Sequence, residues 1–315
     1  MEQSQDPSQR QISGAAIGTV MAALATPLER SGRLDVSSLG RLVDHILAGG
    51  ADGLCPAGST GEGPLLSRET RVALVQAVTG MAPAGTPVIP GTLSVNPDAT
   101  LADIDVYADA GASAVLVPPP FYYPLGDGAV ADFYNYVAER SALPVLIYNI
   151  PAMTKVSVAP AVTAELSDHP RIAGMKDSSR DMEYFSAVAA RTAASEGFCL
   201  LTGSDTLLSA SLAAGGKGTI AASVNLVPGL VRSLYNASIS GEATARSLQA
   251  RLADVVFACR RPGFPAGWKA ALKLAGLCEA TLAAPLREAT EAATAALAEE
   301  LLEVLGEGWE SPKPR

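Results

Sequence analysis

Eight short apolar segments, rich in β-branched residues, alternate along this 315-residue chain with stretches of helical periodicity. This alternation constrains the fold most, because strands that alternate with helices form a parallel sheet covered by those helices. Each segment has the length of a buried strand. The predicted strands are residues 19–25, 53–57, 87–91, 114–118, 144–148, 172–176, 198–202 and 218–222.

Residues with a known capping role mark the helix boundaries between these segments. Asp35 precedes a run whose apolar side chains fall on one helical face, and Asn96-Pro97-Asp98 combines a cap, a first-turn proline and a first-turn acid. Glycines follow the predicted helix ends in Ala48–Leu54, Asp109–Leu116 and Leu212–Ile220. They supply the left-handed residue that a helix end needs before the chain re-enters the sheet.

Eight such units in the first two thirds of the chain predict an α/β fold, the (β/α)8 TIM barrel. A doubly wound sheet is the alternative, but no G-x-G-x-x-G turn follows the first predicted strand. No strand pattern recurs after the eighth segment. We therefore expect a flexible N-terminal arm at residues 1–15, the barrel at 16–224 and a C-terminal helical region at 225–315.

Composition narrows the classes of partner. A net charge of −9 argues against nucleic acid or an anionic membrane surface as the main partner, and no apolar run is long enough to span a bilayer. The four cysteines have neither zinc-site nor disulfide spacing, which favours free buried thiols in a reducing cytoplasm. We therefore expect a cytoplasmic protein that binds a small molecule.

The predicted sixth strand ends on a lysine, Lys176, and in a barrel the functional residues lie at these carboxyl ends. Most lysines at strand ends reach solvent. A lysine held among apolar walls can instead lose its proton and attack a carbonyl carbon. Such chemistry needs a proton shuttle, and Tyr148 ends the adjacent predicted strand. This pairing favours a functional lysine over a structural one.

Other strand ends add groups that suit a small anion. Gly58-Ser59-Thr60-Gly61 offers two hydroxyls and a flexible backbone for a carboxylate, although a glycine-rich turn without a ligand is about as common. Gly203 and Asp205 follow the seventh strand. With only two histidines, His45 and His169, a metal-dependent aldolase or a serine–histidine hydrolase is hard to build, so we expect no metal.

Five motifs, in order along the chain, resemble the dihydrodipicolinate synthase / N-acetylneuraminate lyase family of class I, pyruvate-dependent aldolases. The resemblance extends from about Gly18 to Gly306. The motifs are GLCPAGSTGE at Gly53, PPPFYYP at Pro118, YNIPA at Tyr148, GMKDSS at Gly174 and GGKGTIAASVN at Gly215. No single motif is decisive, but the five at matching intervals are specific.

The resemblance implies a role for each residue. Lys176 would form a Schiff base with the keto carbon of pyruvate or a longer 2-oxo acid, and Tyr148 would move protons. Ser59 and Thr60 would hold the carboxylate, with Ser59 also in the proton relay. Tyr122 would complete that relay, typically across a subunit interface.

The resemblance also implies partners. Ile220 would line the pyruvate pocket through its backbone, and Gly203 and Asp205 would contact the substrate. The substrates would be pyruvate and an aldehyde, with no metal, pyridoxal or nicotinamide cofactor. Members of the family are commonly homotetramers, assembled as dimers of dimers.

Departures from the family pattern narrow the substrate. Dihydrodipicolinate synthases usually carry an arginine where this chain has Met153, which cannot supply a bidentate contact to a second carboxylate. The sialic acid lyases typically have Asp-Glu and a serine where this chain has Asp205-Thr206 and Ala222. Losing hydroxyl-binding groups argues against a long polyol.

We therefore expect a class I pyruvate aldolase that cleaves or forms a 2-keto-3-deoxy sugar acid or a related 2-oxo acid. One alternative is 4-hydroxy-tetrahydrodipicolinate synthase, which condenses pyruvate with aspartate semialdehyde. Another is a Schiff-base sugar-acid dehydratase. The alternative from a different class is a catalytically silent barrel that senses a keto acid, but a sensor would not need the pair of Lys176 and Tyr148.

Overall fold

The computed structural model describes residues 17–307 and residue 309. The expected N-terminal arm, residues 1–15, lies outside the described residues. Seven parallel strands form one curled sheet in the order β2-β1-β7-β6-β5-β4-β3. The strands are β1 Val20–Ala23, β2 Gly53–Cys55, β3 Val115–Val117, β4 Val145–Asn149, β5 Ile172–Asp177, β6 Cys199–Thr202 and β7 Gly218–Ala221.

The third predicted strand, residues 87–91, is not a strand but lies hydrogen-bonded between the two sheet edges. On the β2 side, Ile89 N donates to Leu54 O over 2.9 Å, and on the β3 side Leu116 N donates to Pro90 O over 2.9 Å. Pro90 has no N–H to donate towards β3, which interrupts the hydrogen-bond ladder on that side. Eight parallel segments nevertheless follow one another around the sheet, which is consistent with a (β/α)8 barrel.

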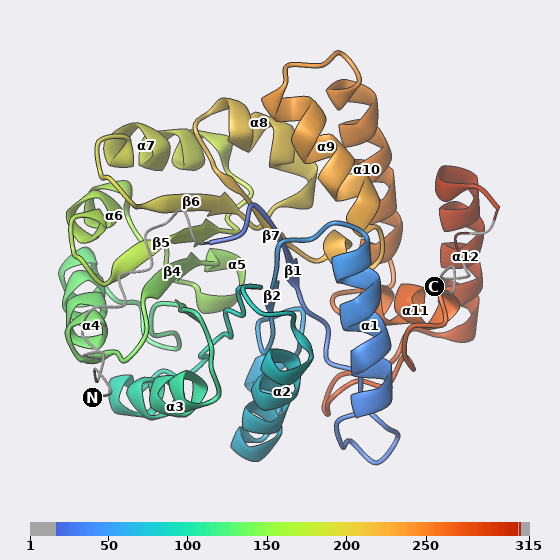
Figure 1. Ribbon diagram of the computed structural model, residues 1–315, viewed down its shortest axis with the longest axis horizontal. Helices are drawn as coiled ribbons and strands as arrows, with labels where there is room; N and C mark the ends of the chain where they lie inside the picture. The colour runs from blue at the N-terminus through green and yellow to red at the C-terminus, as the bar shows by residue number, and fades with distance from the viewer. Residues whose placement is uncertain (1–16, 308, 310–315) are drawn as a thin grey trace, which may run out of the picture.

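Helices surround the strands in chain order, as Figure 1 shows from α2 round to α9 and α1. The capping predictions are confirmed, since the side chains of Asp35 and Asn96 cap α1 and α3. Gly50, Gly111 and Gly215 take the left-handed conformation just after helix ends. The helices of this layer are α1 Val36–Ala48, α2 Arg68–Met81, α3 Pro97–Asp109, α4 Asp127–Arg140, α6 Pro160–Ser167, α7 Met182–Thr192, α8 Leu208–Ala213 and α9 Pro228–Ile239.

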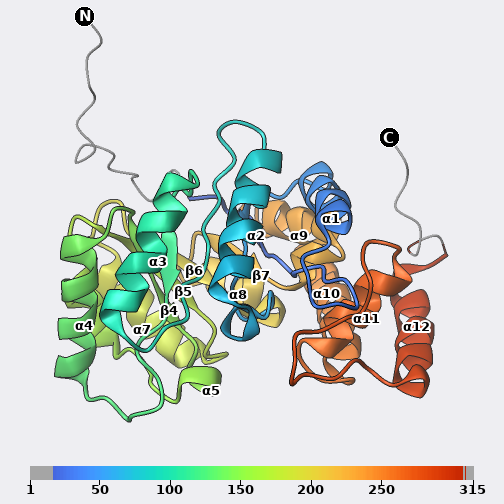
Figure 2. The ribbon, with the colours of Figure 1, turned by 90° about the horizontal axis from the view of Figure 1, so that it is seen from below.

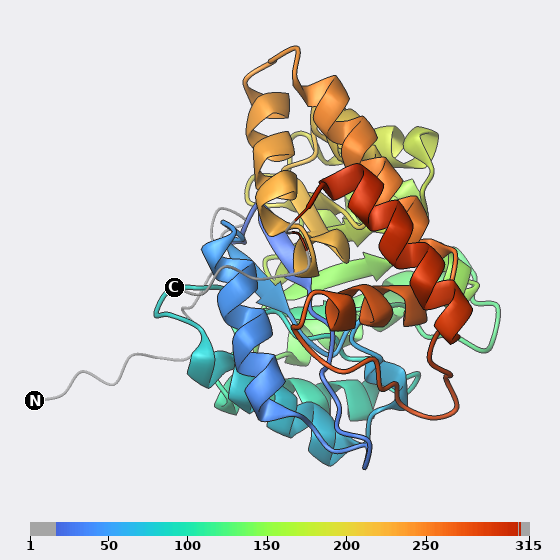
Figure 3. The same ribbon diagram turned by 90° about the vertical axis from the view of Figure 1, so that its right-hand side faces the viewer.

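Every element after β7 in the described chain is helical, as predicted. The helix α9 packs on α8 and α1, whereas the later helices lie together on one side of the molecule, away from α4 (Figure 2). Seen from that side, α12 lies against α10 and α11 (Figure 3). These helices are α10 Ala245–Arg260, α11 Ala266–Leu274 and α12 Glu291–Leu305. The division of the chain at residue 224 stays a prediction.

Side chains alternate between two cores along the strands. In β4, Val145 and Ile147 pack outwards against the helices, while Leu146 and Tyr148 join a separate cluster inside the curled sheet. This period of two places the side chain of every second strand residue in the interior. Functional side chains at the strand ends are therefore expected to lie at the edge of this interior cluster.

No helix in the described part of the chain is long and apolar enough to cross a membrane. The four cysteines are free and buried, as predicted.

Candidate active site

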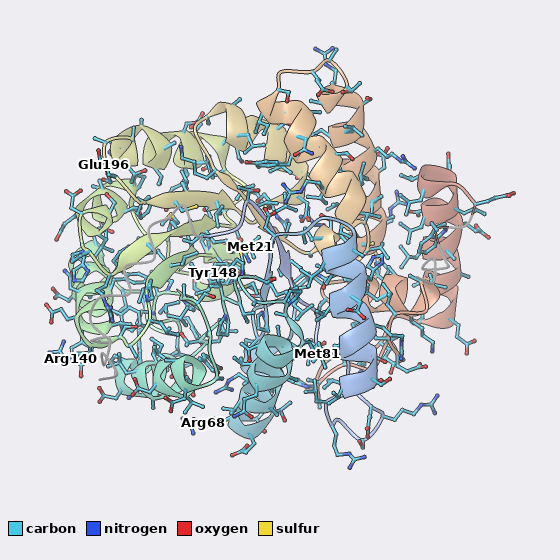
Figure 4. The ribbon with its side chains drawn as sticks, in the orientation of Figure 1. Met21, Arg68, Met81, Arg140, Tyr148 and Glu196 are labelled. Carbon is cyan, nitrogen blue, oxygen red and sulfur yellow. The ribbon has the colours of Figure 1, made fainter. Side chains whose placement is uncertain are left out.

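The site begins with two neighbouring strand ends. In the register of β4 and β5, Tyr148 lies directly beside Lys176, so both side chains stand at the same level of the interior. Lys176 is 4% exposed and Tyr148 is 2% exposed. The Lys176 Nζ atom lies 4.4 Å from the centre of the Tyr148 ring. Figure 4 labels Tyr148 in the middle of the molecule, among the strands.

Glycine makes the room that Lys176 occupies. A Cβ atom on Gly203, at the end of β6, would lie 2.9 Å from Lys176 Cε and would collide with Ser178 Oγ. The absence of that atom lets the lysine side chain pass along the strand end. Gly203 therefore contributes through the space that it leaves, a role that only the packed structure reveals.

The loop after β2 brings a hydroxyl to Tyr148. Ser59 Oγ lies 3.2 Å from the Tyr148 hydroxyl, within hydrogen-bond distance. The loop is tied back to the fold, since Thr26 Oγ1 donates to Gly61 O over 2.6 Å. Glu62, at its end, takes a left-handed φ of 61°. The predicted neighbourhood of lysine, tyrosine and serine is therefore present in one chain.

A cavity of about 120 Å3 collects most of the predicted site residues. It is smaller than the sites of drug-sized ligands, which measure roughly 300–1,000 Å3, and so suits a molecule with few heavy atoms. Its lining includes all the predicted site residues except Tyr122, namely Ser59, Thr60, Tyr148, Lys176, Gly203, Asp205 and Ile220. Met153 and Ala222, where family patterns are broken, also line it.

Tyr122 does not reach the cavity within this chain. Its side chain is 85% exposed, its φ is 90°, and its ring packs edge-on against Tyr123 with centroids 5.1 Å apart. A left-handed φ is strained for a tyrosine and holds the ring away from its own strand ends. A role for Tyr122 in the proton relay therefore requires a second subunit and stays a prediction.

Asp177 and Asp205 fix the surrounding loops. Asp177 Oδ1 accepts hydrogen bonds from Asn149 Nδ2 over 2.7 Å and from the Ser179 backbone N–H over 3.1 Å. Burial raises the pKa of the Asp177 carboxyl, and these hydrogen bonds oppose that rise. Asp205 Oδ1 accepts from the Ser223 N–H over 2.9 Å, which joins the end of β6 to the turn after β7.

Two charged residues of the cavity lining were missed in the sequence, Arg180 and Arg260. Arg180 stands four residues after Lys176, so the sequence alone places it on the loop that follows this strand end. Arg260 ends α10 in the appended helical region, and nothing in the local pattern points towards the strands. No cluster of three or more histidine, cysteine, aspartate or glutamate side chains suited to a metal occurs among residues 17–307 and 309.

Comparison with known proteins places this geometry in a family. The sequence model of the dihydrodipicolinate synthetase family matches residues 16–304. A 4-hydroxy-tetrahydrodipicolinate synthase from Acidiphilium cryptum is 36% identical over 280 residues, which cover 86% of this chain and 94% of that protein.

Solved structures support the same family. One described as the first monomeric dihydrodipicolinate synthase variant has a TM-score of 0.89 and 29% identity, covering 92% of this chain and 98% of that one. YagE from Escherichia coli K12, solved in complex with pyruvate, has a TM-score of 0.87 and 27% identity, covering 92% and 99%. Members of the matched family are pyruvate-dependent lyases and synthases that form carbon–carbon bonds through a Schiff-base lysine. This chain is therefore an enzyme of the dihydrodipicolinate synthetase family.

Proposed function

We propose that Lys176 is the Schiff-base lysine and that the substrate is pyruvate or a longer 2-oxo acid. The observation that carries this is the placement of the buried Lys176 Nζ 4.4 Å from the Tyr148 ring, with Ser59 Oγ 3.2 Å from the Tyr148 hydroxyl. An amine, a phenol and an alcohol thus adjoin one small cavity. A buried amine paired with a proton carrier is the usual arrangement for attack on a carbonyl.

The chemistry then uses only groups of this protein and its substrates. The Lys176 amine adds to the keto carbon, and the carbinolamine loses water to give an iminium ion. Removal of a C3 proton yields an enamine, which attacks the aldehyde carbon, while Tyr148 and Ser59 carry protons to and from the reacting oxygens. Water then hydrolyses the product iminium ion, which releases the product and returns the free Lys176 amine. The reverse sequence cleaves the same bond. No metal or organic cofactor takes part in these steps.

The remaining predicted residues bind and orient. Thr60 and Ser59 hold the substrate carboxylate, the Ile220 backbone and Gly203 line the pyruvate end, and Asp205 faces the substrate. Tyr122 enters the site of a partner subunit, in a homotetramer built as a dimer of dimers. The full (β/α)8 barrel with a C-terminal helical region is part of this proposal, as is a cytoplasmic location.

For the substrate, we favour a 2-keto-3-deoxy sugar acid or a related 2-oxo acid. Met153, which lines the cavity, offers no hydrogen bond to a second carboxylate, and Ala222 offers no hydroxyl to a polyol. A 4-hydroxy-tetrahydrodipicolinate synthase remains the alternative, as the name of the Acidiphilium cryptum relative indicates. A dehydratase would use the same lysine but expel water. A screen of aldehydes with pyruvate separates the aldolase from the synthase.

Borohydride trapping tests the proposal. Pyruvate is incubated with the enzyme, the imine is reduced, and peptides are examined by mass spectrometry for an adduct on Lys176. Lys176→Ala should lose the adduct, whereas Lys217→Ala should keep it, because Lys217 is exposed at the opposite, amino-terminal end of β7. Failure to trap any 2-oxo acid would sink the Schiff-base mechanism, and equal labelling of Lys176→Ala would sink the residue assignment.

A further inference from the structure

Two arginines share the cavity of Lys176 without a full partner. The ionisable side chains that line it are Lys176, Arg180, Arg260 and Asp205, so two guanidinium groups face one carboxylate in a protein of net charge −9. Neither guanidinium donates a hydrogen bond to any other residue within the described part of the chain. A local excess of positive charge at a cavity is typical of a site for an anion.

The loop after β5 holds Arg180 in an unusual conformation. Its φ is 64°, a left-handed value that is uncommon for a residue with a Cβ atom. The residue before it is fixed, since Ser179 Oγ donates to Asp177 Oδ2 over 2.9 Å and accepts from the Asp181 N–H over 3.1 Å. Asp181 then caps α7. This anchored turn places Arg180 beside the cavity rather than leaving it on a free loop.

Arg260 reaches the same cavity from the end of α10. The nearest carboxylate is that of Asp205, but the ion-pair contact between Arg260 Nη2 and Asp205 Oδ2 is long, at 3.9 Å. Asp205 also accepts from the Ser223 N–H through its other oxygen. Burial lowers the pKa of Arg260, and the positive charge of Arg180 lowers it further, so the two guanidinium groups repel one another. An anion between them would relieve that repulsion.

We propose that Arg180 and Arg260 bind a second carboxylate, at the end of the substrate remote from Lys176. The inference rests on the proposed Schiff-base function and narrows its substrate to a 2-oxo acid that carries another acidic group on its far end. Guanidinium groups suit this task because each can donate two parallel hydrogen bonds to one carboxylate. The charge comes from the β5–α7 loop and from α10, so it does not depend on residue 153.

Matched 2-oxo acids test the proposal without knowledge of the natural substrate. 2-Oxoglutarate and 2-oxoadipate each have a chain like that of 2-oxopentanoate or 2-oxohexanoate but end in a carboxylate. The concentration that gives half-maximal borohydride trapping on Lys176 is measured for each acid. We expect at least one diacid to trap at a concentration about 10- to 100-fold lower than its matched monoacid, the range expected for hydrogen bonds between charged groups.

Two variants locate the effect, a double variant and a control. Arg180→Gln with Arg260→Gln should abolish the preference for diacids, so that each diacid traps at the same concentration as its matched monoacid, and an unchanged circular dichroism spectrum shows that the variant is folded. Arg261→Gln is the matched control, because Arg261 neighbours Arg260 but pairs with Glu300 and does not line the cavity. It should keep the preference.

The possible outcomes separate the second-carboxylate site from the Schiff-base function. No diacid preference in the wild type, its survival in the double variant, or its loss in Arg261→Gln would overturn the second-carboxylate site while leaving the Schiff base intact. Absence of any pyruvate adduct would instead overturn the proposed function itself, and with it the inference that rests on it.

Discussion

A buried ion pair beneath the loop that carries Ser59 and Thr60 allows a sharp prediction. Lys269 of α11 and Glu62 of the Ser59–Thr60 loop are 1% and 0% exposed, with Lys269 Nζ 3.0 Å from Glu62 Oε1. Lys269 Nζ also donates to Thr281 O over 2.6 Å, and Glu62 Oε2 accepts from the Ala283 N–H over 2.6 Å. The Oε1 contact lacks hydrogen-bond alignment, so the link is mainly electrostatic. The perturbation is Lys269→Met, which removes the cation but keeps an apolar chain.

The expected magnitude follows from burial. At 3.0 Å and an effective dielectric constant of about 20, the attraction is about 5 kcal/mol, much of which offsets the desolvation of the two charges. Removing Lys269 alone leaves the buried Glu62 carboxyl group without its cation, which should lower the free energy of unfolding by about 3–5 kcal/mol. Adding Glu62→Gln removes that carboxyl group, so the double variant should be more stable than Lys269→Met by about 2 kcal/mol.

Urea unfolding at one fixed protein concentration measures these differences, because assembly would otherwise shift the midpoint. Lys273→Met is the control, one turn further along α11, where Lys273 pairs with Glu279 over 3.2 Å on the surface. An exposed pair of this kind contributes only about 0–1 kcal/mol. The reasoning fails if Lys269→Met is as mild as Lys273→Met, or if the Glu62→Gln effect simply adds to that of Lys269→Met.

Three smaller predictions concern the site, a cap and a thiol. Gly203→Ala should weaken borohydride trapping of pyruvate about tenfold or more with an unchanged circular dichroism spectrum, because its Cβ would lie 2.9 Å from Lys176 Cε; normal trapping would contradict this. Asp35→Ala should cost about 1 kcal/mol of unfolding free energy. Hydrogen bonds from Ser38 lower the pKa of Asp35 in the folded protein below 3.8. The stability that Asp35 contributes is therefore complete above its unfolded-state pKa and is lost as the pH falls through its folded-state pKa. The deficit should therefore shrink between about pH 5 and about pH 3, and a constant deficit would refute the assignment. Burial raises the pKa of Cys55 to about 11, so iodoacetamide at about pH 8 should spare it in the native enzyme but not in urea.

Much of the fold follows from local sequence because each signal acts over a few residues. The Asp35 and Asn96 caps need only their own helix starts, and both were predictable. The pairing of Tyr148 with Lys176 was also predictable, since strands that are consecutive in a βα series are neighbours in the sheet. By contrast, the effect of Pro90 could not be predicted, because a proline disrupts pairing only on the side that its nitrogen faces. That side is known only once the position of β3 is known.

The missed residues depend on contacts between distant segments. Arg180 and Arg260 are brought together only because α10 packs on the turn Asp205–Leu207 that follows β6, and no local periodicity specifies that packing. The pair formed by Glu62 and Lys269 has the same origin. Tyr122 shows a further limit, since its exposed position gives it no function within a single chain. Motifs resembling a family can suggest such roles, but they do not supply the contacts.

The two arginines change what Met153 implies about the substrate. An apolar residue at that position excludes a second carboxylate only if no other cation reaches the cavity, and Arg180 and Arg260 both do. A carboxylate held by those arginines would be bound from the β5–α7 loop and from α10, not by residue 153, which follows β4. An acidic aldehyde would then be held by other residues than in a synthase that has an arginine at that position. Preference among acidic aldehydes, more than the presence of an acid group, should therefore distinguish a sugar-acid aldolase from a synthase that uses aspartate semialdehyde.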